Sequence, residues 1–176
     1  KEATGAIVAT SEQRRVGVVK VLVAMLPRSL SALNQLLARR NGLTSYEVHF
    51  SIFCFLNEHP LFEADARLRS QLLHSLDSYL RSIRSGTAQA AWMAGDLLGD
   101  HWRPEEAVPV LESAAKEAKY VAGREGALHG LAHALDRVPK RQQWGIIGVL
   151  RQVAAEDRST KVRSYASQIL GALRGV

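Results

Sequence analysis

Two histidines four residues apart are the first candidates for chemistry in this 176-residue sequence. His129 and His133 would share one face of a helix, at the spacing that helical metal-binding pairs use. In the repeat register described below, Asp96 and Gln168 are level with His129, and Asp100 is level with His133. The two aspartates and two histidines could therefore approach one another across adjacent helices, an arrangement that suits a metal ion or acid–base work.

A polar ridge on the exposed face of a helical array is the interpretation we prefer for these four residues. The Glu that follows the first histidine of a zincin helix is absent here. The apolar residues Leu128, Leu131 and Leu135 mark the other helix face as the buried one. We therefore predict no metal, no cofactor and no catalytic residue, and expect that the chain is not an enzyme. An enzyme built on the His/Asp residues is the third hypothesis.

Other residues that invite a chemical interpretation fit structural roles better. Gly123, Gly126 and Gly130 lie inside a predicted helix, follow no strand and lack the Gly-Lys-Ser/Thr ending of a phosphate loop. Close helix packing is the preferred interpretation of these glycines. Glu105 and Glu106 are adjacent, so they point about 100° apart on a helix and make a poor acid/base pair.

Composition indicates a globular chain with a basic surface. The apolar fraction is 47%, the charged fraction 23% and the net charge +6, with arginine the commoner basic residue. The charges are interspersed, which favours a solvated helix surface over a basic nucleic-acid groove. The apolar run from Val16 to Leu26 is too short to cross a bilayer, so we predict no membrane partner. Cys54, the single cysteine, lies in an apolar string and is predicted to be a buried thiol, which fits a cytoplasmic setting.

Apolar residues recur at helical spacing along almost the whole chain, and no stretch shows sustained strand alternation. The short loops between the segments predict antiparallel helical hairpins. The predicted helices run from Ser11 to Leu26, on to Arg39, from Thr44 to Asn57, from Pro60 to the turn at Ser85, from Ala88 to Leu98, from Pro104 to Lys119, from Val121 to Leu135, from Lys140 to Ala155 and from Ser159 to Leu173.

The sequence repeats itself. With Ala94, Ala127 and Ala166 placed in register, each segment has a small residue, an apolar residue four positions later, and then another small residue. Small residues let helix backbones approach closely, and the apolar ones fill the layer between successive units.

These repeats resemble the HEAT family of helical repeats. Pro104 to Leu135 resembles one full repeat, with Pro109 inside its first helix and Arg124 opening its second. Arg151 to Leu173 is similar, with Asp157 and Arg163 around its turn. The resemblance implies that an Asp and an Arg at such positions bond between neighbouring units. The match is partial, because Glu117 takes the place of the Asp in one unit and Ala91 that of the Arg in the earliest.

The resemblance implies an all-α fold, a right-handed α-solenoid of stacked antiparallel helical hairpins, in one continuous domain. Residues 61–176 would hold the HEAT-like repeats. Residues 1–60 lack the pattern and are predicted to form degenerate repeats or an end cap. The last predicted helix leaves an apolar face unaccounted for, which predicts that the array continues or self-associates.

Trp92 is in register with Glu125 and Ser164, both polar, which suggests that it faces solvent or a partner. The alternative is that Trp92 fills a gap between helical layers. Trp102 follows an inter-repeat turn and is predicted to pin that turn.

We expect a non-enzymatic scaffold or adaptor that binds a protein or peptide through the face formed by successive second helices. The alternative is a nucleic-acid-binding module with an Arg-rich surface, since HEAT-like solenoids include DNA glycosylases with a basic concave groove. The predicted contact residues are Trp92, Asp96, Asp100, Glu125, His129 and His133.

Overall fold

The computed structural model describes residues 50, 53–54, 56–58, 60, 66–83 and 88–173. These residues form helices and no strand, so the all-α prediction is confirmed for them. The chain divides into two compact units, residues 1–75 and 76–176, which are treated separately below. Within the described residues, no helix combines the length and the apolar character that a membrane crossing needs.

In the first unit, Phe53 and Leu56 are fully buried. Cys54 between them is only half-buried, so the prediction of a buried thiol is wrong. The described part continues into α3 (Ala66–Ser82), where Leu72 is buried and the hydroxyl of Ser75 donates to the carbonyl of Gln71. The helices predicted before residue 50 lie outside the described residues.

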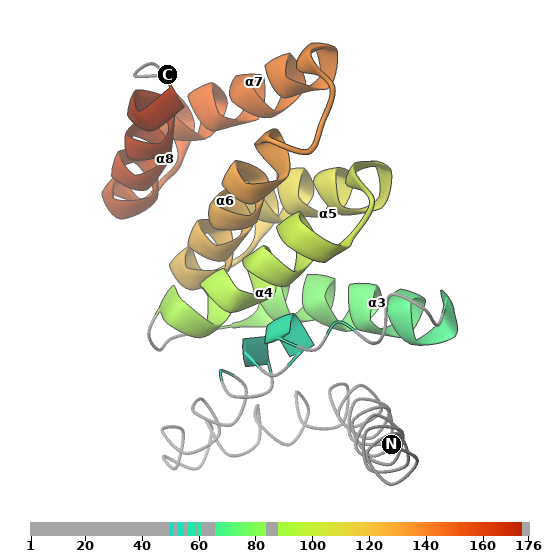
Figure 1. Cartoon of the computed structure of the whole chain (residues 1–176). Coiled ribbons are helices and arrows are strands. Elements are labelled where there is room, and N and C mark those ends of the chain that lie inside the picture. The colour runs from blue at the N-terminus through green and yellow to red at the C-terminus, as the bar shows by residue number, and fades with distance from the viewer. Residues whose placement is uncertain are drawn as a thin grey trace, which may run out of the picture. The chain divides into compact units, whose positions relative to one another are not determined.

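In the second unit, the remaining helices follow the predicted bounds closely (Figure 1). The one real difference is α4, which was predicted to end at Leu98 but passes through Gly99 to His101. The helices are α4 (Ala88–His101), α5 (Pro104–Glu117), α6 (Val121–Leu135), α7 (Lys140–Glu156) and α8 (Thr160–Leu173).

Local sequence explains where these helices begin and which face they bury. Pro104 opens α5 because its fixed φ suits the first helical position, and two glutamates in the first turn complement the helix dipole. Helix α7 buries Ile146, Leu150 and Val153, which lie on one face at intervals of four and three residues.

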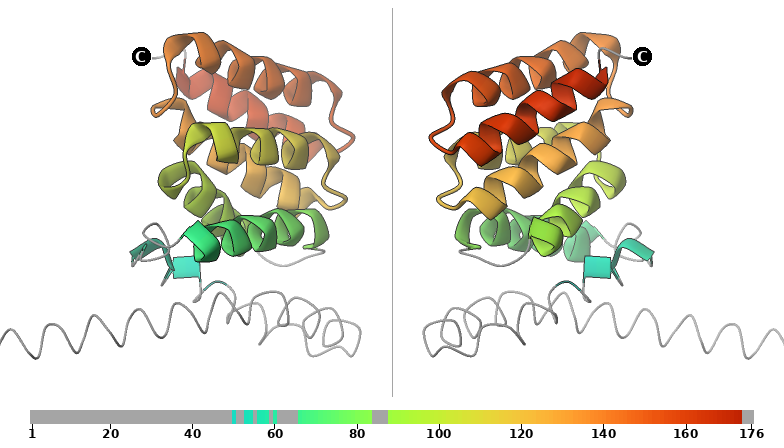
Figure 2. Two further views of the ribbon diagram at one scale, coloured as in Figure 1. Left: turned by 90° about the vertical axis from the view of Figure 1, so that its right-hand side faces the viewer. Right: turned by 90° about the vertical axis from the view of Figure 1, so that its left-hand side faces the viewer.

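The helices of the second unit pack as hairpins in two layers. Helix α5 packs on α6, and α7 packs on α8. Across the hairpins, α6 contacts both α4 and α8, while α5 contacts α7. Figure 2 shows α5 and α7 on one side and α4, α6 and α8 on the other. Helices α4, α6 and α8 therefore share one layer.

Helices α4 and α6 touch through their backbones. A Cβ atom on Gly126 would overlap the carbonyl oxygen of Ala91, and one on Gly130 would lie 2.6 Å from the carbonyl oxygen of Gly95. Gly99 faces the same interface, with the carbonyl oxygen of Gly130 at 2.6 Å from its Cβ position. The prediction that these α6 glycines serve close packing is confirmed, and it explains why Gly99 continues the helix.

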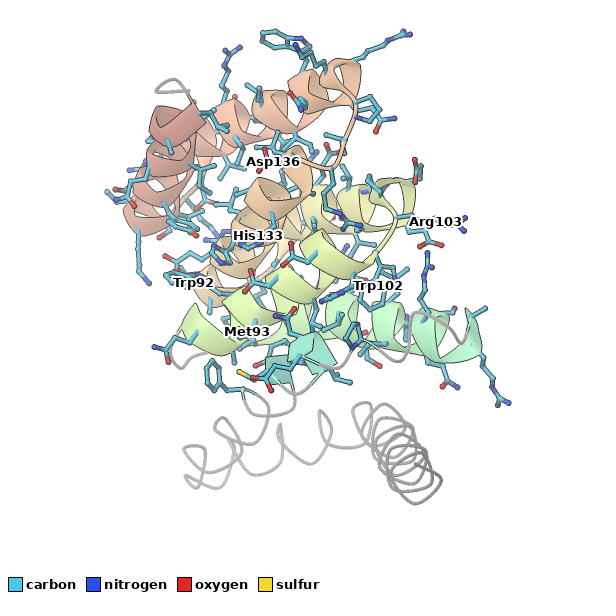
Figure 3. All side chains as sticks on the ribbon, viewed as in Figure 1. Trp92, Met93, Trp102, Arg103, His133 and Asp136 are labelled. Atoms are coloured by element: carbon cyan, nitrogen blue, oxygen red, sulfur yellow. The ribbon has the colours of Figure 1, made fainter. Side chains whose placement is uncertain are left out.

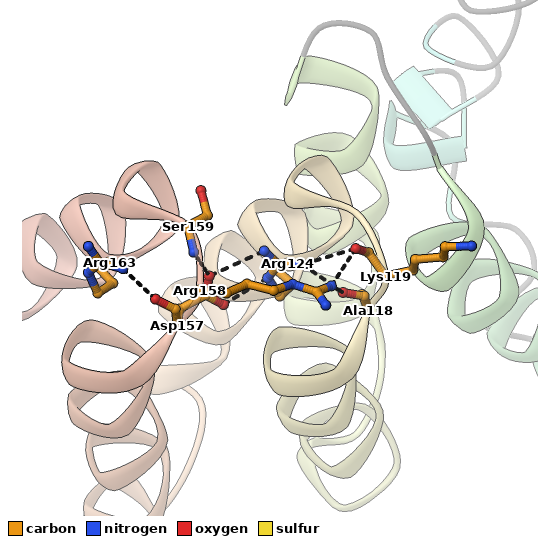
Figure 4. A network of polar contacts seen from close by, with 7 residues as sticks. All are labelled: Ala118, Lys119, Arg124, Asp157, Arg158, Ser159 and Arg163. Carbon is orange, nitrogen blue, oxygen red and sulfur yellow. Dashed lines mark hydrogen bonds and ion pairs between the residues drawn. The ribbon is translucent and has the colours of Figure 1, made fainter.

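A buried ion pair joins the α5–α6 hairpin to the α7–α8 hairpin (Figure 4). The Nε and Nη2 atoms of Arg124 donate to the two carboxylate oxygens of Asp157, at 2.7 and 3.2 Å. Nη1 of Arg124 donates to the carbonyl oxygen of Ala118, which follows α5. In the next hairpin, Nη1 of Arg163 donates in the same way to the carbonyl oxygen of Asp157, which follows α7. The Arg and Asp that the family resemblance singled out thus bond between hairpins.

Candidate functional site

The four His/Asp residues come together on the layer of second helices. The Nε2 atoms of His129 and His133 lie 3.0 and 3.2 Å from Oδ1 of Asp96. Nδ1 of His133 lies 3.0 Å from Oδ1 of Asp100. We call Asp96, Asp100, His129 and His133 the His/Asp cluster. Its aspartates come from α4 and its histidines from α6, so the register read from the sequence placed all four correctly.

The backbone contact between α4 and α6 brings the cluster together. Asp96 and Asp100 directly follow Gly95 and Gly99, the two α4 glycines of that contact. His129 directly precedes Gly130 on the α6 side. With no side chain between the helices at these points, short aspartate side chains on α4 can reach imidazole rings on α6.

Aromatic rings extend the cluster towards α8. The indole of Trp92 stacks on the imidazole of His129, with ring centroids 5.1 Å apart, and on the phenol of Tyr165, with centroids 5.6 Å apart. The Tyr165 hydroxyl lies 2.7 Å from Nδ1 of His129. Trp92 and His133 face the same side of the second unit in Figure 3. Helices α4, α6 and α8 therefore each contribute a ring to one patch. We use the word patch for the His/Asp cluster together with Trp92 and Tyr165.

The patch is partly exposed. Side-chain exposure is 15% for Asp96, 25% for His129 and 37% for His133. Burial, followed by the negative charges of Asp96 and Glu125, raises the pKa of Tyr165 to about 12. The phenol therefore stays neutral at physiological pH and can donate or accept a hydrogen bond at His129.

Two predicted contact residues differ from the expectation of full exposure. Glu125 is only 3% exposed, and its carboxylate pairs with Nζ of Lys161 at 2.8 Å, so its place on an exposed ridge is wrong. The register argument failed there because α8 covers that point of α6. Trp92 is half-buried by its own stacking partners, and its buried Nε1 has no hydrogen-bond acceptor among the described residues.

The other tryptophans behave differently from Trp92. Trp102 is 1% exposed after the end of α4, in agreement with a role in holding that turn. Trp144 on α7 is 66% exposed, the most open large apolar side chain in the described part of the chain. It lies in the other helix layer and provides a natural control for experiments on Trp92.

Tyr165 is the residue of the patch that the sequence did not reveal. In the repeat register it is level with Met93 and Gly126, neither of which belongs to the patch. The available signal was an aromatic side chain one position from the register alanine of α8.

A hollow of about 170 Å³ lies away from the patch and is lined by Lys116, Gln152, Val153, Glu156 and Asp157. It holds one end of the Arg124–Asp157 pair.

No family model, curated protein or solved structure matches the chain. The case for a role of the patch therefore rests on its geometry.

Proposed function

We propose that this chain is a non-enzymatic HEAT-like module, a right-handed solenoid of stacked hairpins, that binds a protein or peptide partner. The repeat architecture is supported by Ala94, Ala127 and Ala166, which are all fully buried on successive second helices. It is further supported by the Arg124–Asp157 ion pair between hairpins. Repeats of this kind bury their apolar stripes against one another and leave an extended face for a ligand.

The stack of Trp92, His129 and Tyr165 is the observation that carries the binding proposal. Large, rigid aromatic side chains that are already ordered lose little entropy when a partner docks, and tryptophan and tyrosine are enriched among residues that dominate binding energy. The stack is partly exposed, and the His/Asp cluster beside it offers both hydrogen-bond acceptors and ring nitrogens. Such a mixed polar and aromatic patch suits a peptide segment.

Arginine-rich composition, the basis of the nucleic-acid alternative, is in part explained by structural bonds within the second unit. Arg124, Arg158 and Arg163 bond to carbonyl or carboxylate groups at the hairpin turns. We place the module in the cytoplasm, on the support of a single cysteine in the whole sequence.

A selection from a phage-displayed peptide library, carried out with chelator present, tests the proposal. Peptides selected on the wild-type chain should bind Trp92→Ala about tenfold or more weakly, as expected for a binding hot spot. The same peptides should bind Trp144→Ala within about twofold of wild type, because the other helix layer is not used. Circular dichroism and melting temperature establish that both variants are folded.

Two results would overturn the proposal. One is a library that yields no peptide binding at micromolar concentration. The other is a set of peptides that lose affinity for Trp144→Ala and keep it for Trp92→Ala, which would place the binding surface on the first helices.

A further inference from the structure

The His/Asp cluster has the donor set of a transition-metal site. One oxygen of Asp96 and one nitrogen each of His129 and His133 all lie within 4.8 Å of one another. Two imidazoles and a carboxylate suit Zn²⁺ and its neighbours, whereas Mg²⁺ and Ca²⁺ prefer oxygen donors alone. In tetrahedral zinc coordination, bond lengths near 2.1 Å place neighbouring donor atoms about 3.4 Å apart. The Nε2–Oδ1 distances of 3.0 and 3.2 Å are within a few tenths of an ångström of that spacing.

In both histidines the Nδ1 atom contacts a polar group that can fix the orientation of the ring, as is usual for metal-binding histidines. Nδ1 of His133 faces the carboxylate of Asp100, and Nδ1 of His129 faces the hydroxyl of Tyr165. Metal-ligating histidines almost always bond through the second ring nitrogen to a carboxylate, carbonyl or water, which fixes the tautomer and the ring orientation. The two Nε2 atoms are left to converge on Asp96.

The position of the ring proton on His133 decides what its Nε2 atom presents to Asp96. A carboxylate only accepts hydrogen bonds, so a neutral His133 can donate from Nδ1 to Asp100 or from Nε2 to Asp96 but not to both, and with the proton on Nδ1 the Nε2 atom is a lone pair. That lone pair faces Oδ1 of Asp96 at 3.2 Å. Two acceptors at this distance repel each other unless a cation or an added proton lies between them.

Asp96 Oδ1 supplies a second, independent observation. This oxygen is buried and accepts no hydrogen bond from the described residues as long as the two ring nitrogens at 3.0 and 3.2 Å from it carry no proton. A buried carboxylate oxygen without a hydrogen bond is costly, and such oxygens are normally paired or bound to a metal. A metal ion bound jointly with the two Nε2 atoms satisfies all three acceptors at once.

We propose that Asp96, His129 and His133 bind a divalent transition-metal ion, with Zn²⁺ as the reference ion, and that Asp100 and Tyr165 act as positioning residues. Three protein ligands leave a further coordination position, and the partial exposure of both histidines lets water reach it. The ion would link α4 to α6. Metal binding does not depend on the peptide-binding proposal, since it needs no partner.

Isothermal titration of Zn²⁺ into the chelator-treated full chain tests the site. We expect one ion per chain with micromolar or tighter affinity. Asp96→Asn and His129→Ala should each weaken binding at least about tenfold. His74→Ala removes an exposed α3 histidine and serves as the matched control, with unchanged affinity expected. Co²⁺ in place of Zn²⁺ should show the visible absorption of a nitrogen- and oxygen-ligated ion, and Asp96→Asn should remove it.

The positioning residues have their own readout. Tyr165→Phe and Asp100→Asn should keep one ion per chain but lower the affinity about tenfold, since second-shell partners tune a site without forming it. Should His129→Ala fail to fold, the nearly isosteric Asp96→Asn still decides the question. Absence of Zn²⁺ binding to the wild-type chain overturns the proposal, and so does binding that survives Asp96→Asn or is lost in His74→Ala. Because the peptide selection is run with chelator, either proposal can fail alone.

Discussion

Arg124 carries its charge into the interior of the second unit, with side-chain exposures of 2% for Arg124 and 4% for its partner Asp157. All three guanidinium nitrogens are engaged, because Nη1 also donates to the carbonyl oxygens of Ala118 and Lys119. A buried ion pair adds little net stability compared with apolar packing, but removal of one partner leaves an uncompensated charge. The pair therefore fixes how two hairpins dock.

Asp157→Asn should lower the free energy of unfolding by about 3 kcal/mol, since Arg124 would remain buried without its counter-ion. Urea denaturation measures the loss. Glu117→Gln is the matched control: hydrogen bonds from Ser113 and Arg81 lower the pKa of Glu117, but its carboxylate is solvent-exposed. That variant should melt nearly as wild type does, because exposed ion pairs contribute little. Equal losses in the two variants would contradict the buried role of Asp157.

Tyr165 should ionise at a higher pH than an unperturbed tyrosine does. The folded pKa of about 12 exceeds the ordinary value of 10.0, so the folded state holds the phenolic proton more tightly than the unfolded state. The resulting stabilisation is complete below pH 10 and is lost as the pH rises towards 12. Ultraviolet titration of the metal-free chain should show a late tyrosine transition that Tyr165→Phe removes. A Tyr165→Phe titration curve with the late step intact would contradict the assignment.

The sequence located most of this site because one register relation was sufficient. Alignment of Ala94 with Ala127 placed Asp96 and Asp100 beside His129 and His133, and a four-residue spacing put both histidines on one face. It could not reveal Tyr165 or the burial of Glu125, because both depend on how α8 lies across α6. Such angles arise from the packing of whole helices, which a residue register does not encode.

At the scale of elements, α4 and α6 form the central pair of the second unit. Their glycines place the backbones in direct contact, while Gly145 and Gly148 of α7 have open space where a side chain would be. The helix bounds were predicted well from proline starts and apolar spacing. The exception was Gly99, since a glycine at a helix crossing and a glycine at a helix end look alike in sequence.

Two alanine substitutions separate these two kinds of glycine. Gly126→Ala should destabilise the chain by about 3 kcal/mol, because its Cβ would overlap the Ala91 carbonyl group and force the helices apart. Gly148→Ala should stabilise it by about 0.5–1 kcal/mol, because alanine favours the helix and meets no neighbour. Chemical denaturation of both variants gives the comparison. A Gly126→Ala protein as stable as wild type would mean that α4 and α6 are farther apart.

At the scale of the whole molecule, the net charge of +6 raises the question of a nucleic-acid partner. In the described second helices, basic groups stand among acidic ones, as Lys161 does beside Glu125. This mixture differs from the continuous basic surface that follows a phosphate backbone.

Binding to a labelled DNA duplex at two salt concentrations tests the charge argument. We expect weak binding that changes less than about tenfold between 50 and 200 mM salt, because few phosphates would be neutralised. A loss of about a thousandfold would indicate six or more phosphate contacts and would favour the nucleic-acid alternative over a peptide partner. A duplex of scrambled sequence controls for base-specific binding.

The main-chain contact between α4 and α6 has a consequence for how this protein can vary. Where side chains separate two helices, exchange of one core residue for another changes the distance between the helix axes. Here the carbonyl oxygen of Gly95 meets Gly130 directly, so the spacing is set by atoms that every amino acid shares. Substitutions among the surrounding leucines and alanines should therefore alter the melting point long before they alter the separation of Asp96 from His129.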